Sequence, residues 1–547
     1  MRLILIWMAI ATLLIACSPT ENAPSSVKNS QTKEIINVDL GADIATLDPQ
    51  LTEDTQSVRV ANDLFEGLTS FDQSNQAVPG LAESWQISGD GKTYTFYLRP
   101  GIKFSNGSPI RTDDILFTFQ RLAAPATASP YSFLLSNLVN GQDIIAGKLV
   151  PERLGITALN PTTIQIRLVH PDPSFLSICN QAQLGIVSKA TLKKHANAWT
   201  NEKNLVSSGA YQLKTRIVNG YILIEKNPYY YAESSVNIPK VKFFPIVDGN
   251  SSLNQYKAGN LDITYTLPID QYKEIKQQMP EQEHTVTWET IEYLDFNMNS
   301  PKFKNNLKLR QALSIAIDRN TIVKQVMGQG QTILFSYATP TVEGGKFADL
   351  VYPWASWPRE RQIAYAKQLF SEAGYNSQHP LSITISYNTN DGHKKKALAI
   401  SAMWQQVFGS SSIQVTSNNQ EWKTFLQSRH NGDYDVARDG WVADYDSVDS
   451  YTALYQCGNP QNNAKACTPR YNQLLEQAQT SSEPETRIKL LHQALQLAMD
   501  NYAIIPLYQS TYFRLVNPQI KNYFIERNHL DHVMSKWYAM ESQITTY

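Results

Sequence analysis

Short apolar runs alternate with polar stretches along most of the chain, and their spacing changes between two kinds of pattern. Residues 35–40 and 381–385 alternate apolar and polar positions, which predicts β-strands. Residues 301–326 and 358–373 carry apolar side chains at helical spacing, and the second segment closes at Gly374. These patterns predict an α/β protein.

One stretch, residues 420–449, joins both patterns. Trp422, Phe425 and Leu426 share one side of an amphipathic helix, and residues 435–437 then predict a short buried strand. The nine residues that follow hold an arginine, a tryptophan, a tyrosine and several carboxylates. An ammonium taken out of water needs a carboxylate, and a carboxylate needs N–H donors, so this mixture suits a small zwitterion. It is equally compatible with a surface loop that carries one half-buried ion pair.

The first residues predict export. Residues 1–16 hold one early positive charge and an apolar run too short to cross a membrane, which predicts a signal peptide. The run ends Leu-Ile-Ala-Cys and resembles a bacterial lipobox, so Cys17 is the predicted site of lipidation. An ordinary signal peptide followed by a chance cysteine is the alternative. Residues 17–33 are polar and aperiodic, which predicts a flexible tether.

Length, charge and cysteine usage narrow the class of protein. At 547 residues the chain predicts two or three domains, and 48 basic residues against 49 acidic ones argue against a nucleic-acid partner. Cys457 and Cys467 lie close in sequence and predict a disulfide in an exported protein. Cys179 lies in an apolar run and predicts a buried free thiol.

Catalytic and phosphate-binding motifs are missing from the sequence. There is no His-Glu-x-x-His pair and no Gly-x-Ser-x-Gly, and Gly345-Lys346 lacks the first glycine of a phosphate-binding loop. Ser30 and Lys33 have Ser-x-x-Lys spacing but lie in the tether. We therefore expect no catalytic residues, metal or cofactor, with a periplasmic peptidase as the enzymatic alternative.

A series of ordered motifs carries a resemblance over roughly residues 35–540. They include Pro-Gly-Leu-Ala-Glu-Ser-Trp at 79–85, Ser-Gly-Ala-Tyr at 208–211, Glu-Lys-Asn-Pro-Tyr-Tyr at 225–230, Leu-Arg-Gln-Ala-Leu-Ser-Ile-Ala-Ile-Asp-Arg at 309–319, and Tyr-Asn-Thr at 387–389. With the 420–449 stretch, their order and spacing resemble the extracytoplasmic solute-binding proteins of ABC transporters. Within them the chain resembles bacterial extracellular solute-binding protein family 5, and most closely the oligopeptide-binding proteins of Gram-negative bacteria.

The resemblance implies an α/β, two-lobed periplasmic binding protein fold (type II) with an extra subdomain and a cleft between the lobes. Lobe I is expected from 34–66, 191–295 and 512–543, with residues 67–190 inserted as a subdomain, and lobe II from 296–511. Two chain crossings between the lobes can act as a hinge.

The resemblance also implies a ligand site. Asp444 matches the carboxylate for a peptide ammonium, Glu53 an acidic position near the cleft, and Tyr131 and Trp441 the cleft walls. The positions expected to face the ligand's carboxyl end are Arg429, Arg438 and His393. Alternatives stay open for each group: Asp444 as a loop cap, Glu53 on the surface, Arg438 paired with Asp439 or Asp435, and the aromatic residues in the core. Val442 is also expected in the ligand site, where close relatives have a cysteine. Met327 stands at a position that can be lysine, and both differences leave the preferred ligand length open.

The implied function is that of a lipid-anchored periplasmic protein that captures short peptides and delivers them to an ABC permease. We expect a monomer that meets the membrane only through its lipid. A murein peptide, a dipeptide or a non-peptide solute such as a metal chelate are the alternative cargoes.

Overall fold

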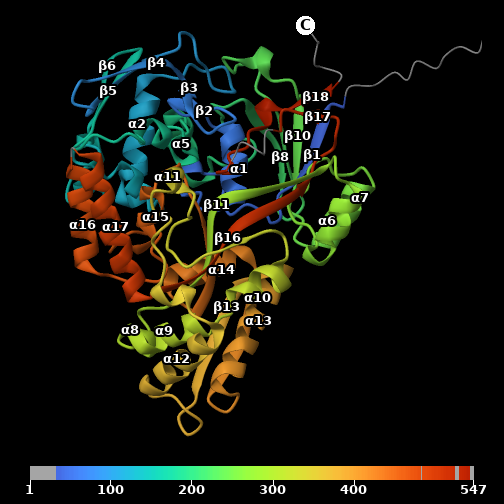
Figure 1. Ribbon diagram of the computed structural model, residues 1–547. Helices are drawn as coiled ribbons and strands as arrows, with labels where there is room; N and C mark the ends of the chain where they lie inside the picture. Colours follow the sequence, from blue (N-terminus) through green and yellow to red (C-terminus); the bar gives the residue numbers. More distant parts are fainter. Residues whose placement is uncertain (1–32, 482, 524–528, 542–547) are drawn as a thin grey trace, which may run out of the picture.

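The computed structural model describes residues 33–481, 483–523 and 529–541. The predicted signal peptide, Cys17 and nearly all of the tether lie outside the described residues. Strands and helices alternate along the chain and assemble into two lobes (Figure 1), so the predicted two-lobed α/β fold is confirmed.

The upper lobe of Figure 1 is built on a four-stranded sheet with the order β1-β10-β9-β8. Its strands are β1 (Ile35–Asp39), β8 (Tyr211–Ile217), β9 (Tyr221–Lys226) and β10 (Lys240–Phe244). Alternate side chains of these strands are buried, among them Ile36 and Val241, and they pack with Val60 and Leu64 of helix α1 (Thr55–Leu64). The expected strand at 35–40 is therefore confirmed as β1.

The segment between α1 and β8 contains a second four-stranded sheet, in the order β4-β5-β7-β6, and we call this part of the structure the inserted unit. The strands are β4 (Ala82–Ile87), β5 (Thr93–Leu98), β6 (Ile156–Asn160) and β7 (Thr163–Arg167). Helix α2 (Thr112–Ala123) packs on this sheet because Ile115, Phe119 and Leu122 recur at helical spacing and are all buried.

The lower lobe contains a six-stranded sheet in the order β12-β16-β11-β15-β13-β14. Its strands are β11 (Glu283–Phe296), β12 (Thr332–Ile333), β13 (Leu381–Asn388), β14 (Ile413–Gln420), β15 (Val436–Val442) and β16 (Ile504–Leu515). The helices of this lobe include α12 (Arg359–Glu372), α13 (Asp391–Phe408) and α14 (Trp422–Asn431). Trp404 of α13 is fully buried and donates its Nε1–H to the carbonyl of Leu313 at 2.8 Å.

The single helix expected over 301–326 is broken into several pieces. The pieces are α8 (Pro301–Lys304), α9 (Leu307–Ala316), α10 (Arg319–Thr321) and a π-helical turn, η9 (Ile322–Met327). The breaks fall at Asn306 and Asp318, whose side chains accept N–H groups of the following turn and so start new helices. The helix expected over 358–373 is confirmed as α12.

Two long antiparallel strands, β11 and β16, connect the lobes (Figure 1). At the upper end, residues 283–287 of β11 pair with 511–515 of β16, and further down residues 290–296 of β11 pair with β15. The register between β11 and β16 shifts after Thr287, where a β-irregularity interrupts the ladder. The chain therefore passes between the lobes in two neighbouring strands.

The cysteines are arranged as predicted within the described residues. Cys457 and Cys467 form a disulfide, and Cys179 is a buried free thiol. The disulfide precedes the helix pair α16 (Pro469–Thr480) and α17 (Pro484–Asn501), which flanks the inserted unit in Figure 1. None of the helices in the described part of the chain is long and apolar enough to cross a bilayer.

Candidate functional site: the cleft between the lobes

A cavity of about 630 Å³ lies between the lobes and is lined by residues of both lobes and of the inserted unit. All eight ligand-site candidates from the sequence line this one cavity: Glu53, Tyr131, His393, Arg429, Arg438, Trp441, Val442 and Asp444. They come from strand β15 and the residues just after it, from helices α13 and α14, and from the segments that precede α1 and follow α2. The fold thus gathers residues separated by almost 400 positions around one space.

Strand β15 is longer than the sequence suggested. It was expected to end at Ala437 and to be followed by a loop, but it continues to Val442 because its whole length pairs with β11, from Val436 opposite Phe296 to Val442 opposite Thr290. Arg438 and Trp441 are therefore strand residues with fixed directions, and their side chains point to opposite faces of the sheet.

Asp444 follows the end of β15 and is held by hydroxyl groups. Its Oδ1 accepts a hydrogen bond from the Tyr131 hydroxyl at 3.4 Å and its Oδ2 accepts one from the Ser450 hydroxyl at 3.2 Å. No lysine, arginine or histidine of the described chain forms an ion pair with it. Burial raises the pKa of Asp444 to about 7, and the two hydroxyl bonds only partly oppose this. The carboxylate thus lacks a positive partner.

The rings of Tyr131 and Trp441 stack at the same end of the cavity. Their centroids are 6.2 Å apart and their planes differ by 12°, and both side chains are buried. The inserted unit approaches β15 further through Gln181, which donates to the carbonyl of Asp444 at 2.9 Å. The two aromatic residues serve both predicted roles, because they line the cavity and also belong to the core.

Two more carboxylates lie near Tyr131. Glu53 is only partly exposed, and its Oε2 lies 2.9 Å from Nε2 of His430 of α14, so it is not the surface residue considered as an alternative. Asp54 caps α1 by accepting the N–H of Ser57, and burial raises its pKa to about 6. This end of the cavity is therefore acidic.

The charge of Arg429 is paired inside the protein. Arg429 forms a buried ion pair with Asp439, next to Asp295. Burial, and then the neighbouring charge of Asp439, raise the pKa of Asp295 well above its ordinary value. Burial also acts to raise the pKa of Asp439, but the charge of Arg429 helps to keep that pKa below the ordinary value of an aspartate. Arg429 therefore favours the ionised form of Asp439, whereas burial and this negative charge favour the protonated form of Asp295.

Arg438 pairs with neither of the partners considered from the sequence. Its Nη2 donates to Oε1 of Glu292 at 2.7 Å, whereas Asp439 pairs with Arg429 and Asp435 pairs with Lys302. His393 lies in the first turn of α13. Burial, and then the charges of Arg438 and Lys396, lower the pKa of this histidine well below its ordinary value, so it is neutral at pH 7.

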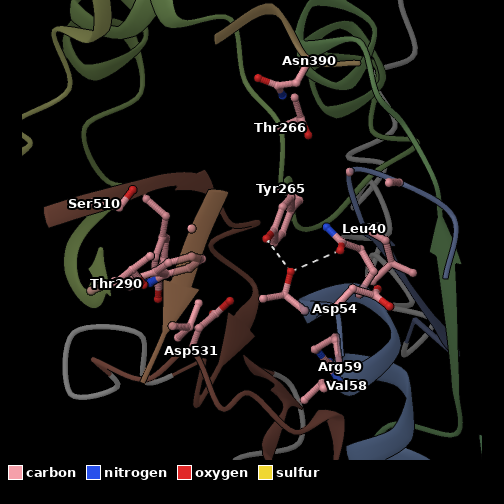
Figure 2. A pocket seen from close by; sticks show the side chains of 18 of the residues that line it. Leu40, Asp54, Val58, Arg59, Tyr265, Thr266, Thr290, Asn390, Ser510 and Asp531 are labelled. Carbon is pink, nitrogen blue, oxygen red and sulfur yellow. Dashed lines mark hydrogen bonds between the residues drawn. The ribbon is translucent and has the colours of Figure 1, made fainter. Parts of the chain in front are cut away.

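A further part of the wall was not predicted from the sequence. Figure 2 shows Tyr265, Thr290, Ser510 and Asp531 around the same pocket. The hydroxyl of Tyr265 lies 3.3 Å from that of Thr55. Arg514 of β16 donates to Asp531 at 2.8 Å, and its guanidinium lies 4.9 Å from the ring centroid of Tyr265. These residues are far apart in sequence and share no local motif, so only the fold brings them together.

Glu292 and Lys396 were also missed, although the sequence holds a signal for the lysine. His393, Lys396, Ile400 and Trp404 follow one another at intervals of three or four, which places them along one side of α13. Lys396 is the member of the Lys394-Lys395-Lys396 run that faces inward. Among the described residues no group of three or more His, Cys, Asp and Glu side chains is arranged to hold a metal ion.

Two α/β lobes joined by paired strands around a polar cavity define a class of solute-binding proteins. The chain belongs to the bacterial extracellular solute-binding proteins, family 5, whose model matches residues 76–463. The predicted family is confirmed. The periplasmic oligopeptide-binding protein OppA of Salmonella typhimurium is 35% identical over 525 residues, which cover 95% of each chain.

Solved structures agree with this assignment. The Haemophilus influenzae OppA complex with the peptide RPPGFSPFR superposes with a TM-score of 0.90 at 33% identity, covering 93% of this chain and 99% of that one. A structure of the Escherichia coli murein tripeptide binding protein MppA gives a TM-score of 0.88 at 32% identity, covering 92% of this chain and 98% of that one. The unliganded open form of MppA gives a TM-score of only 0.64 at the same identity, although the match covers 93% of this chain and 97% of that one. The lobes are therefore not arranged as in that open form.

Proposed function

We propose that this protein captures short peptides in the interlobe cavity and delivers them to an ABC permease from the periplasmic side of a membrane. The observation that carries the proposal is Asp444, a carboxylate in the cavity wall that has hydroxyl partners but no cation partner among the residues that the structure describes. A ligand ammonium would supply the missing charge. The similarity to oligopeptide-binding and murein tripeptide binding proteins supports the same ligand class.

Capture of peptides with different sequences must use what all peptides share: the backbone, the α-ammonium and the terminal carboxylate. Because peptide length varies, only one end can lie at a fixed depth. Asp444, enclosed by the Tyr131–Trp441 stack, provides a fixed site for the ammonium. The neutral His393 and the Arg438 region provide donors for the other end.

Three measurements test the function. Native mass spectrometry of the purified protein should find co-purified peptides, and their masses distinguish general oligopeptides from murein peptides or dipeptides. Calorimetry should then show that a free peptide binds far more tightly than its N-acetylated form. Equal binding of both forms would contradict the role of the ammonium. Incubation with a pentapeptide should return it intact, and cleavage products would favour the peptidase alternative.

Closure of the lobes accompanies binding in this proposal. We assign lobe I to residues 34–66, 191–295 and 512–543, the inserted subdomain to 67–190 and lobe II to 296–511. The irregular register near Thr287 supports bending where β11 and β16 pass between the lobes. Ligand that contacts both lobes should favour the closed arrangement. X-ray scattering should give a smaller radius of gyration with saturating peptide than without it, for a monomer in both states, and an unchanged radius would contradict closure.

The N-terminus supports anchoring through a lipid on Cys17, after removal of residues 1–16. In this proposal the chain contacts the membrane only through that lipid and the tether. A Cys17→Ser variant should leave the membrane fraction while keeping its affinity for peptide, since the cysteine is remote in sequence from every cavity residue. Retention of the variant in the membrane fraction would contradict lipid anchoring.

A further inference from the structure

Lys396 is a lysine buried in the wall behind the cavity. It lies in α13, is 1% exposed, and donates its Nζ to Glu292 at 2.5 Å and to the Tyr508 hydroxyl at 3.1 Å. Lys394, two residues earlier in the same helix, is exposed. A charged ammonium removed from water is costly unless it is paired, so this position is unusual for a lysine.

Glu292 is shared between two cations. Its Oε2 accepts from Lys396 and its Oε1 accepts from Arg438 at 2.7 Å. Burial alone would raise the pKa of Glu292, but Arg438 and then Lys396 outweigh it, and the pKa is lowered. With His393 neutral, the cluster holds two positive charges and one negative charge. Its net charge is therefore positive.

The surplus charge is available on the cavity side. Glu292, Arg438 and Tyr508 line the cavity, whereas Lys396 is not among the described lining residues. Arg438 is not saturated with partners. Its Nε has no hydrogen-bond partner among the described residues, and its Nη1 has only a 3.5 Å contact with Asn388. Arg438 can thus donate to a ligand while it stays paired with Glu292.

The spacing along β15 suits an extended ligand. Arg438 and Val442 are four residues apart in the strand, which corresponds to about 13 Å at ~3.3 Å per residue. Asp444 lies beyond Val442. An extended peptide advances by about the same length per residue. A ligand whose ammonium meets Asp444 would therefore place a carboxylate near Arg438 if it is a few residues long.

We infer that Glu292 and Lys396 are positioning residues that set the charge of a carboxylate subsite at Arg438. Lys396 balances Glu292, so that Arg438 keeps a net positive charge toward the ligand. Without the lysine, Glu292 and Arg438 would form a neutral pair with little attraction for an anion. This inference rests on the peptide-binding function proposed above, and the ligand group is a carboxylate, either at the peptide's C-terminus or on an acidic side chain.

The test compares trialanine, tetraalanine and pentaalanine as free acids and as C-terminal amides, by calorimetry on the full chain. The readout is the ratio of the two affinities, which a merely structural defect would not change. Wild type should prefer the free acid by about tenfold or more for at least one length. Lys396→Met should bring that ratio close to one, while the exposed Lys394→Met serves as the matched control and should keep it.

Two more variants change the net charge of the Glu292–Lys396–Arg438 cluster in known steps. Glu292→Gln leaves two cations without a carboxylate and should raise the ratio above that of wild type. The double variant Glu292→Gln with Lys396→Met removes one charge of each sign, restores a net positive cluster and should restore preference for the free acid. This double variant also covers the case in which Lys396→Met alone fails to fold.

The outcomes separate the inference from the proposed function. Absence of peptide binding by wild type would contradict the proposed function itself. Binding of free acid and amide with equal affinity, or an unchanged ratio in Lys396→Met, would overturn the inference and leave peptide binding standing. Amidated tetraalanine variants with one glutamate at each position identify the source of the carboxylate. Recovery of the lost affinity by one of them would assign the subsite to an acidic side chain, and recovery by none would assign it to the C-terminus.

Discussion

The two ends of the cavity differ in how completely the protein balances its own charges. At one end Asp444 has two hydroxyl partners and no cation within the described chain, and burial raises its pKa to about 7. At the other end Glu292 lies between Arg438 and Lys396, so each of the three side chains has a partner of opposite charge and one positive charge is left over. The first end is incomplete without a ligand, whereas the second is nearly complete. Ligand binding should therefore depend more strongly on the first end.

The largest effect is expected from the incomplete end. Asp444→Ala should weaken peptide binding by roughly two orders of magnitude or more, because a ligand ammonium left unpaired in a closed cavity typically costs about 3–5 kcal/mol. N-acetylation of the peptide should weaken binding to wild type by a similar factor. Since both changes remove one interaction, the combined loss should be far from additive. Calorimetry on the four combinations of protein and peptide measures this.

The exposed residue Asp446 provides the matched control for that cycle. Asp446→Ala removes a carboxylate two positions away and should leave both affinities nearly unchanged. Additive losses for Asp444→Ala and acetylation would show that the carboxylate and the ammonium do not meet.

The next effect tests how the incomplete end is supported. The disulfide loop contacts this end: Asn463 donates to Asp439 at 3.2 Å, and Gln461 donates to the carbonyl of Pro130, next to Tyr131. Replacing Cys457 and Cys467 together by serine should lower the free energy of unfolding by roughly 2–3 kcal/mol in the chain-entropy model. Denaturant unfolding measures the loss, and peptide mapping of unreduced wild type should find the two cysteines linked. An unchanged midpoint would contradict a stabilising role for this bond.

The third effect concerns the cost of an unpaired carboxylate in the ligand-free protein. The raised pKa of Asp444 means that its contribution to stability is fully present below the ordinary value of 3.8 and is lost as the pH rises through about 7. Asp444→Asn should therefore stabilise the ligand-free protein at pH 8 and have almost no effect near pH 4. Thermal unfolding at both pH values measures this.

Excess peptide should reverse the order of stability at pH 8, because the ammonium of the ligand stabilises the ionised carboxylate of wild type but not the amide of the variant. A variant that is less stable than wild type at pH 8 without ligand would show that Asp444 is already paired in the free protein.

The sequence allowed more to be predicted about the incomplete end than about the complete one. Asp444, Trp441 and Tyr131 could be identified because each carries a motif of the family, and all three line the cavity. The pairing of Glu292 with Lys396 could not be predicted, since 104 positions separate them and neither lies in a recognisable motif. A run of three lysines normally indicates a solvated surface, and only the helical spacing from His393 to Trp404 shows which one faces inward.

Local chemistry explains the remaining differences between expectation and structure. Asn306 and Asp318 accept backbone N–H groups and so divide the helix expected over 301–326, because cap residues override an apolar period that continues through them. Strand β15 extends to Val442 because β11 pairs with it throughout. That extension depends on a partner strand nearly 150 residues earlier in the sequence, and no local pattern reveals it.

The smallest effect comes from the neighbour of Lys396. Lys395 forms an ion pair with Asp270 of the opposite lobe at the rim of the cleft, but the two side chains are 38% and 76% exposed. Exposed ion pairs contribute little because water and salt screen them, so Lys395→Ala should change peptide affinity by less than about threefold at physiological ionic strength. It should also leave the ratio of free-acid to amide affinity at its wild-type value, in contrast to Lys396→Met one position further along the same helix. Repeating the calorimetry at high salt should remove even the small loss. A tenfold loss for Lys395→Ala at physiological ionic strength would show instead that the rim pair holds the lobes together, and that binding does not depend mainly on the buried ends of the cavity.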